Sequence, residues 1–179
     1  MNIALIGKTG SGKSTLTNYL AGRFGLEVIS ASGCIRKYAA THPKVQEAVE
    51  KSFETGVDIP HAIVTRIHNA KLKELDGKDF IIDNVICPHL FNVYDKKRRI
   101  DFVFYLEISY DLVKSRITRR ARTNNLEQHF ENRRELFERS FPKLQKMLGD
   151  RLITINAALT PEIVSAQVEA IINGKLWVR

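Results

Sequence analysis

The chain has 179 residues, of which 44% are hydrophobic, so it is long enough to form one domain with a substantial buried core. It contains two cysteines, Cys34 and Cys87, which excludes a disulfide-stabilised scaffold and a cysteine metal cage. A formal net charge of +8 and a pI near 9.6 indicate an anionic ligand or partner.

The first residues predict a protein of the cytoplasm. A strand pattern at residues 2–6 stands directly at the amino terminus and leaves no room for a signal peptide. The longest core-like apolar run, residues 102–106, has the length of a strand and not of a membrane span. We therefore expect a reduced cytoplasmic protein, a monomer without a membrane partner.

Short apolar segments alternate with amphipathic segments along the chain. Strand patterns cover residues 2–6, 27–29, 80–82, 102–108 and 152–155. Helical patterns cover residues 14–24, 33–36, 44–53, 58–75, 109–117 and 126–148, with a last helix from Thr160 and Pro161 to Gly174. Pro142 should kink the long helix. This alternation, without repeats or linkers, predicts one α/β domain over residues 1–179, with a parallel sheet between helices.

A phosphate-binding loop is the strongest local pattern. Residues 7–14 read GKTGSGKS between the first strand and the first helix, matching G-x-x-x-x-G-K-[ST]. Glycine amides and the helix N-terminus bind nucleotide phosphates, while Lys13 supplies charge and Ser14 a magnesium ligand. We expect ATP and Mg²⁺ here. The predicted ATP contacts from this segment are Gly7, Thr9, Gly10, Ser11, Gly12, Lys13, Ser14 and Thr15.

The rest of the chain favours a small kinase over other phosphate-loop proteins. A guanine-specific Asn-Lys-x-Asp run is absent, and the third strand is followed by Asp83, Asn84, Val85 and Ile86, not by Asp-x-x-Gly. A large ATPase motor needs a longer chain. A small kinase needs an acceptor pocket and arginines that neutralise the transferred phosphoryl group.

With these parts, the chain resembles the adenylate kinase-like nucleoside monophosphate kinases over almost its whole length. Residues 29–36, ISASGCIR, are similar to that family's Ile-Ser-Thr-Gly-Asp-x-Leu-Arg segment, and residues 55–60 to its loop over the acceptor base. Residues 112–122 and 130–134 are similar to the helices entering and leaving its lid. The resemblance implies a P-loop NTPase fold with a five-stranded parallel sheet, an acceptor-binding helical insertion at about residues 30–75 and a short lid at about residues 119–133.

The resemblance also implies individual roles. Arg36 would hold the acceptor phosphate, Arg116 and Arg120 the donor side of the lid hinge, and Arg122 and Arg133 would close on the phosphates. The implied catalytic residues are Lys13, Arg36, Arg120, Arg122 and Arg133. Arg116 and the main chain of Ala158 would add to the ATP site. The residues implied at the acceptor site are Ser30, Ser32, Arg36, Val57, Asp83 and His89. The residues implied at the metal site are Ser14 and Asp83.

The acceptor half departs from the family pattern. The family has Asp-Gly-Phe-Pro-Arg after the third strand, whereas residues 83–89 read DNVICPH and lack the arginine that grips the acceptor phosphate. His89, which we expect in a loop, is the candidate substitute, and the alternative is a solvated side chain. Ser30 and Ser32 could hydrogen-bond a ligand, and the alternative is that either of them caps the short helix that follows. The pattern therefore does not identify AMP as the acceptor.

The leading hypothesis is transfer of the γ-phosphoryl group from Mg·ATP to a nucleoside monophosphate, giving ADP and a nucleoside diphosphate. One alternative is a P-loop kinase for a non-nucleotide small molecule, which would explain the missing arginine. Another is an ATPase module that binds nucleic acid through the basic clusters at residues 96–99, 116–122 and 133–146. No aromatic-interleaved recognition motif accompanies these clusters, so small nucleotides are the expected partners rather than nucleic acid.

Overall fold

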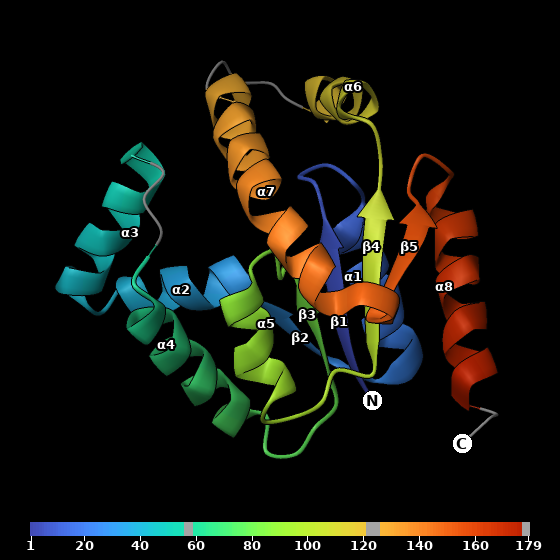
Figure 1. Cartoon of the computed structure of the whole chain (residues 1–179), viewed down its shortest axis with the longest axis horizontal. Helices are drawn as coiled ribbons and strands as arrows, with labels where there is room; N and C mark the ends of the chain where they lie inside the picture. The colour runs from blue at the N-terminus through green and yellow to red at the C-terminus, as the bar shows by residue number, and fades with distance from the viewer. Residues whose placement is uncertain (56–58, 121–125, 177–179) are drawn as a thin grey trace.

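A five-stranded parallel sheet with the order β2-β3-β1-β4-β5 forms the centre of the computed structural model (Figure 1). The structure describes the backbone of residues 1–55, 59–120 and 126–176 and the side chains of residues 1–52, 59–118 and 130–174. The strands are β1 (Asn2–Gly7), β2 (Glu27–Ser30), β3 (Phe80–Asp83), β4 (Phe102–Glu107) and β5 (Leu152–Asn156). This confirms the predicted parallel sheet.

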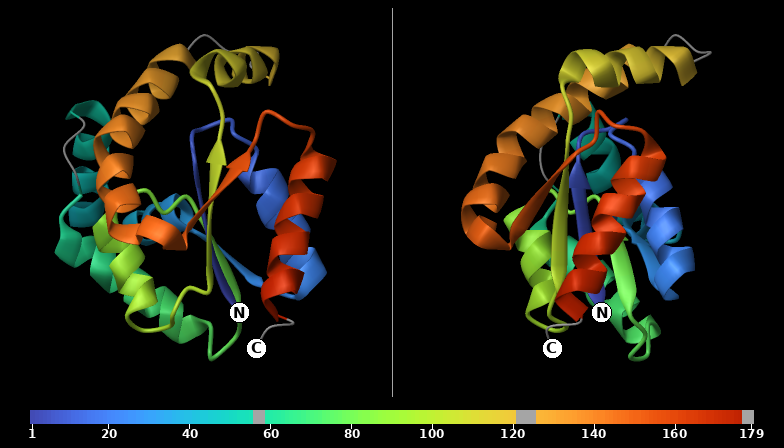
Figure 2. Two further views of the ribbon diagram at one scale, coloured as in Figure 1. Left: turned by 45° about the vertical axis from the view of Figure 1, so that its right-hand side comes forward. Right: turned by 90° about the vertical axis from the view of Figure 1, so that its right-hand side faces the viewer.

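Helices cover both faces of the sheet (Figure 2). On one face, α1 (Lys13–Phe24) packs beside α8 (Pro161–Leu176). On the other lie α5 (Pro88–Asp95) and α7 (Leu126–Leu148), the latter followed by the 3-10 turn η1 (Gly149–Arg151). Within the residues that the structure describes, no helix combines the length and apolar character needed to cross a membrane.

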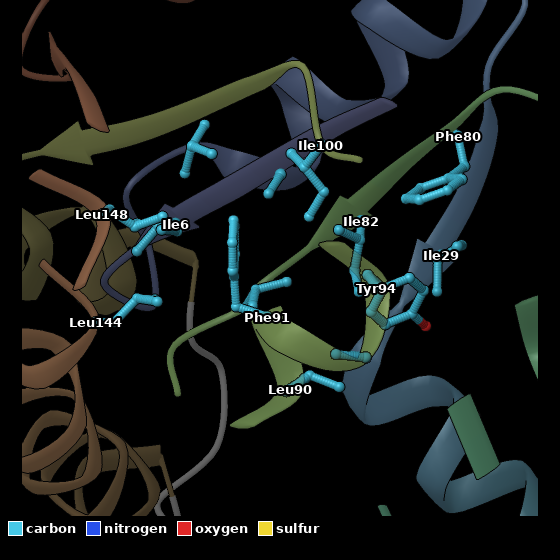
Figure 3. Close-up of a cluster of buried hydrophobic side chains, with 14 of the residues drawn as sticks. Ile6, Ile29, Phe80, Ile82, Leu90, Phe91, Tyr94, Ile100, Leu144 and Leu148 are labelled. Atoms are coloured by element: carbon cyan, nitrogen blue, oxygen red, sulfur yellow. The ribbon is translucent and has the colours of Figure 1, made fainter. Parts of the chain in front are cut away.

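Alternating side chains of the strands divide the interior into two cores. On β1, Ile3 and Leu5 pack with α1 and α8, whereas Ala4 and Ile6 pack with α5 and α7. All four side chains are fully buried. In the second core, Phe91 and Tyr94 of α5 lie against the sheet near Ile6 and Ile82 (Figure 3). Burial on both faces explains why the strands read as uninterrupted apolar runs.

Three helices form an arm beside the sheet: α2 (Ala31–Ala39), α3 (Pro43–Thr55) and α4 (His61–Glu74) (Figure 1). The first of them begins at Ser30, whose Oγ accepts a hydrogen bond from the Gly33 amide at 3.1 Å. A Cβ at Gly33 would lie 2.9 Å from Ser30, so this turn requires glycine. Ser30 is therefore the capping residue, and Ser32 is exposed on the helix.

Two predictions about helices were wrong. The segment around His89 is not a loop, because α5 begins at Pro88 and the Cys87 sulfur accepts the Leu90 amide at its N-terminus. Gly174 does not end the last helix, which continues to Leu176. Glycine weakens a helix interior without necessarily ending it.

Helix α6 (Tyr110–Arg120) lies above the carboxyl edge of the sheet, and the first part of α7 rises above the same edge (Figure 1). Helix α6 begins as predicted at Ser109, whose Oγ accepts the Leu112 amide at 3.3 Å. Helix α7 contains Pro142 and remains one helix, although its ribbon curves along its length (Figure 2). The kink expected from Pro142 therefore takes the form of a bend without a break.

His68 is a buried polar group in the core between α4 and α5. Its Nδ1 lies 2.6 Å from the Tyr94 hydroxyl, and its Nε2 is buried without a hydrogen-bond partner. Burial lowers the pKa of His68 from 6.5 to about 4, because the charged imidazolium would lose its hydration. The folded protein therefore keeps His68 neutral in a range where the unfolded chain protonates it.

This buried histidine should make the fold sensitive to mild acid. As the pH falls through 6.5 toward 4, only the unfolded state gains the proton, so the free energy of unfolding should drop by up to about 3 kcal/mol. In His68→Gln, which keeps a hydrogen-bonding partner for Tyr94 but does not titrate, that part of the pH dependence should disappear. Urea unfolding at pH 7, 6, 5 and 4 measures both profiles. Parallel profiles would show that His68 does not cause the acid sensitivity.

Candidate functional site

The predicted phosphate loop connects β1 to α1 at the carboxyl edge of the sheet (Figure 1). Gly10 and Gly12 have φ angles of +85° and +97°, a conformation that other residues adopt at a cost. A Cβ on Gly10 would also lie 3.1 Å from a side-chain carbon of Val113 on α6. Gly12 directly precedes α1, so the loop runs into a helix N-terminus, the arrangement that binds phosphate.

Lys13 lies inside this loop and is only 9% exposed. Its ammonium group donates to the carbonyl oxygens of Gly7 at 2.7 Å and Lys8 at 2.8 Å. Burial lowers the pKa of Lys13 to about 8; the charge of Arg133 acts in the same direction, and the carboxylate of Asp83 opposes both. An anionic ligand in the loop would favour the charged lysine and give it stronger partners than two carbonyls.

Asp83 and Ser14 supply oxygen atoms beside the loop. Asp83 ends β3 and pairs in register with Leu5 of β1, and its Oδ1 is buried without a hydrogen-bond partner. Ser14 is exposed on the first turn of α1. An unpaired carboxylate oxygen and an exposed hydroxyl at this edge fit a hard cation such as Mg²⁺. Burial raises the pKa of Asp83, while Lys13 counteracts that rise.

The buried carboxylate of Asp83 should oppose stability while it supports activity. Since its pKa is raised in the fold, ionisation above the ordinary aspartate pKa destabilises the folded state. Asp83→Asn should therefore melt no lower than the wild type at pH 8, yet lose about 10- to 100-fold in ATP-dependent activity. Thermal unfolding and an ADP-release assay measure the two effects. The exposed Asp150→Asn is the control, and a strongly lowered melting temperature in Asp83→Asn would contradict this role.

The structure brings together two residues that the sequence assigned to the ATP site. Arg116 of α6 donates to the carbonyl oxygens of Ala157 at 3.0 Å and Ala158 at 3.4 Å. The Ala158 amide in turn donates to the Asn156 side chain at 3.0 Å. Arg116 thus joins α6 to the loop between β5 and α8, over 40 residues further along the chain.

One contact between the phosphate loop and α7 has no counterpart in the sequence-based prediction. Two cations lie over the Tyr110 ring, with Lys8 Nζ at 4.2 Å and Arg134 Cζ at 4.5 Å from its centroid. Lys8 also donates to the Ile108 carbonyl at 2.5 Å. These cation–π contacts connect the phosphate loop, α6 and the helix that carries Arg133.

A cavity of about 740 Å³ lies between the arm, α5 and α7. That volume suits a small-molecule ligand. Figure 1 shows the arm on one side and α7 on the other. The apolar side chains that line the cavity are Ile35, Ile59, Val64, Ile86, Cys87, Leu90 and Leu136. Its polar lining consists of Ser52, His61, His89, Asn132, Arg133, Glu135, Glu138, Arg139 and Ser140.

The predicted acceptor residues are only partly assembled around this cavity. His89 lines it, together with Arg133 of the predicted lid set. Arg36 and Ser32 are exposed on α2 and are not among its lining residues, and Ser30 caps that helix. The side chain of Arg120 and the whole of Arg122 and Val57 lie outside the described residues, as does the span between α6 and α7.

His61 is a cavity residue that the sequence pattern did not single out. Its ring stacks on that of His89, with centroids 4.0 Å apart and an interplanar angle of 4°. The Nε2 atom of His89 lies 2.8 Å from the Thr65 hydroxyl. Nothing in the spacing of His61 and His89 could have revealed this contact, because it depends on how α4 packs against α5.

Comparison with known proteins gives one family and a set of distant relatives. The model of the family described as AAA domain, AAA_17, matches residues 6–136. An adenylate kinase of Corynebacterium aurimucosum is 26% identical over 175 residues, 92% of this chain and 95% of that protein. One of Wolbachia pipientis is 24% identical over 213 residues, covering 98% of this chain and 100% of that protein. The resemblance seen in the sequence is thereby confirmed as distant homology.

Another adenylate kinase, from Buchnera aphidicola, is 30% identical over 125 residues. The match takes in 67% of this chain but only 56% of that protein, so this chain spans little more than half of the relative.

Proposed function

Because the chain belongs to the family of AAA domains, with adenylate kinases as distant homologues, we propose that it transfers the γ-phosphoryl group of Mg·ATP to a nucleoside monophosphate. One observation carries this proposal. Arg133 lines the 740 Å³ cavity, and its charge also lowers the pKa of Lys13 in the phosphate loop. The same guanidinium group therefore acts on both a donor site and an acceptor-sized cavity, as direct transfer between two bound molecules requires.

The proposed reaction needs no covalent intermediate on the protein. An oxygen of the acceptor's phosphate attacks the γ-phosphorus, the bond to the bridging oxygen of the β-phosphate breaks, and ADP leaves with that oxygen. The attacking oxygen is already a nucleophile, so no strong general base is required. Lys13 and the arginines neutralise charge on the transferred group. Ser14, and Asp83 through water, would hold Mg²⁺, which would supply positive charge for the phosphates of ATP.

The remaining roles belong to the same proposal. Arg116 would support the donor site from α6, and Arg36 would approach the acceptor from α2. Arg120 and Arg122 would act with Arg133 in a lid at about residues 119–133 that closes and excludes water. Residues 30–75 would form the acceptor-binding insertion of a single-domain monomer in the cytoplasm.

A panel of acceptors tests the proposal. ADP release from Mg·ATP is measured with each ribo- and deoxynucleoside monophosphate and without an acceptor. At least one monophosphate should raise the rate well above the control. ADP release that no acceptor accelerates would contradict the proposal and indicate a hydrolase.

The histidine at position 89 also favours a second candidate, a kinase with a non-nucleotide acceptor. The family has an arginine at this position, and an imidazole carries less charge than a guanidinium group. The charged group of the acceptor would therefore be of another chemical type or be bound less tightly. Acceleration by a phosphorylated non-nucleotide and by no nucleotide would select this candidate. Binding of an oligonucleotide that weakens steeply with salt would instead support a nucleic-acid module.

A further inference from the structure

We propose that the stacked imidazoles of His61 and His89 form the subsite that binds the anionic group of the acceptor, with Thr65 orienting His89. This inference rests on the proposed function and assigns the acceptor's phosphate to a definite part of the cavity. In place of the arginine that the family has after its third strand, two imidazoles are contributed by different helices.

The two imidazoles stand where two helices begin. His61 is the first residue of α4, and His89 is the second residue of α5. Since their rings stack at 4.0 Å, the two helix N-termini converge at one wall of the cavity. Neither helix has an acidic residue in its first turn, so no side chain there offsets the positive end of either dipole. Convergence of two positive helix ends favours an anion.

Charged side chains of α7 line the same cavity. Helix α7 contributes two guanidinium groups, from Arg133 and Arg139, and two carboxylates, from Glu135 and Glu138. Glu138 is paired with Arg134, whose Nε lies 3.1 Å from its Oε1. One of the two carboxylates therefore already has a cationic partner, and Arg133 brings a guanidinium group to the same cavity.

Thr65 explains how His89 would present a hydrogen-bond donor. If the Thr65 hydroxyl donates to Nε2 over their 2.8 Å contact, the neutral imidazole carries its proton on Nδ1. That proton is then available to an anionic oxygen. Stacking on His61 restricts rotation of the ring, so the donor is oriented before the ligand arrives.

The side chains that line the cavity define the class of ligand. Apolar side chains, including Ile35, Ile59 and Val64, line the part contributed by the arm, so they can cover a flat or apolar body. A molecule with such a body and one phosphate group matches both parts. Nucleoside monophosphates belong to this class, and nucleosides lack its anionic group.

Variants of the two histidines test the subsite. His89→Phe keeps a ring to stack on His61 but removes both nitrogens, and His61→Phe does the same from the other side. Each should raise the Kd of the wild type's best monophosphate at least about 10-fold, as expected for a lost hydrogen bond to a charged group. The KM for ATP should change less than 2-fold. Thr65→Val should raise the acceptor Kd by less than either Phe variant does. His89→Arg should bind the monophosphate about as well as the wild type does.

A matched control comes from a second stacked histidine. His42 stacks on Tyr38 with ring centroids 3.8 Å apart and is not among the cavity's lining residues. His42→Phe should leave acceptor Kd unchanged. NMR titrations without ATP give a second readout. The imidazole signals of His61 and His89 are identified by their loss in His61→Phe and His89→Phe. In the wild type these signals should shift on addition of AMP, GMP, CMP or UMP and shift much less with the corresponding nucleosides.

The outcomes separate this inference from the proposed function. Normal turnover with unchanged acceptor affinity in both Phe variants would overturn the histidine subsite and leave the kinase assignment intact. Monophosphate-dependent imidazole shifts without any phosphoryl transfer would support the subsite and overturn the kinase assignment. Imidazole signals that respond equally to nucleosides and monophosphates would overturn the subsite, because recognition of the anionic group would then be absent.

Discussion

Replacement of Lys13 by alanine is expected to lower kcat/KM for ATP-dependent phosphoryl transfer by a factor on the order of 10³, about 4 kcal/mol. The lysine ammonium is buried in the loop and held by two carbonyl oxygens at 2.7 and 2.8 Å. No other described lysine makes those contacts, and a neutral methyl group cannot stabilise charge on the transferred phosphoryl group. Steady-state kinetics of ADP release against ATP concentration measure the loss.

Two controls separate chemistry from folding in that experiment. Lys73 is exposed on α4, so Lys73→Ala should retain full activity. Burial lowers the pKa of Lys13, so its charge costs the folded state stability and the melting temperature of Lys13→Ala should stay close to the wild type. Activity of Lys13→Ala near that of Lys73→Ala would remove the phosphate loop from the catalytic mechanism.

Arg133→Ala is expected to produce the second large loss, a fall in kcat of about 10²- to 10³-fold. The side chain lines the proposed acceptor cavity, and its charge also acts on Lys13 in the phosphate loop. Because it would meet charge that develops during transfer, the KM for ATP should change little. Single-turnover and steady-state measurements distinguish a slower transfer step from weaker ATP binding.

Arg23 provides the comparison for this variant. It is an exposed arginine on α1 that pairs with Glu169 of α8 at 2.8 Å, away from the cavity lining. Arg23→Ala should therefore leave kcat unchanged. Arg133→Lys keeps a charge but not the planar fork, so an intermediate rate is expected. Unchanged kcat in Arg133→Ala would exclude this residue from the transfer step.

The sequence predicted the phosphate loop well because its chemistry is local. The positive φ angles of Gly10 and Gly12 and the buried position of Lys13 follow from a contiguous motif between a strand and a helix. The five strands were also predictable, since burial on both faces gives short apolar runs. Helix α5 was not, because it has only 8 residues and a cysteine at its N-cap, where serine, threonine, aspartate or asparagine is usual.

The parts of the site that depend on tertiary contacts were only partly predictable. Arg116 donates a hydrogen bond to the Ala158 carbonyl, a contact that the resemblance did not specify when it assigned both residues to the ATP site. The contact of Tyr110 with Lys8 and Arg134 joins three separate elements, and no periodicity of side chains signals it. The stacking of His61 on His89 likewise depends on the packing of α4 against α5. The roles of all the predicted site residues remain predictions, and the side chains of Arg120, Arg122 and Val57 also lie outside the described part of the chain.

The most direct test of phosphoryl transfer between the Lys13 loop and the adjacent cavity follows the γ-phosphorus itself. Phosphorus NMR of a mixture of protein, Mg·ATP and the best acceptor of the panel reports where that atom goes. We expect the γ-phosphate signal to decline as a new phosphoanhydride signal of the acceptor rises with equal intensity, and Lys13→Ala to show neither change. Conversion of ATP to ADP and inorganic phosphate alone, at the same rate with and without acceptor, would contradict the proposed transfer.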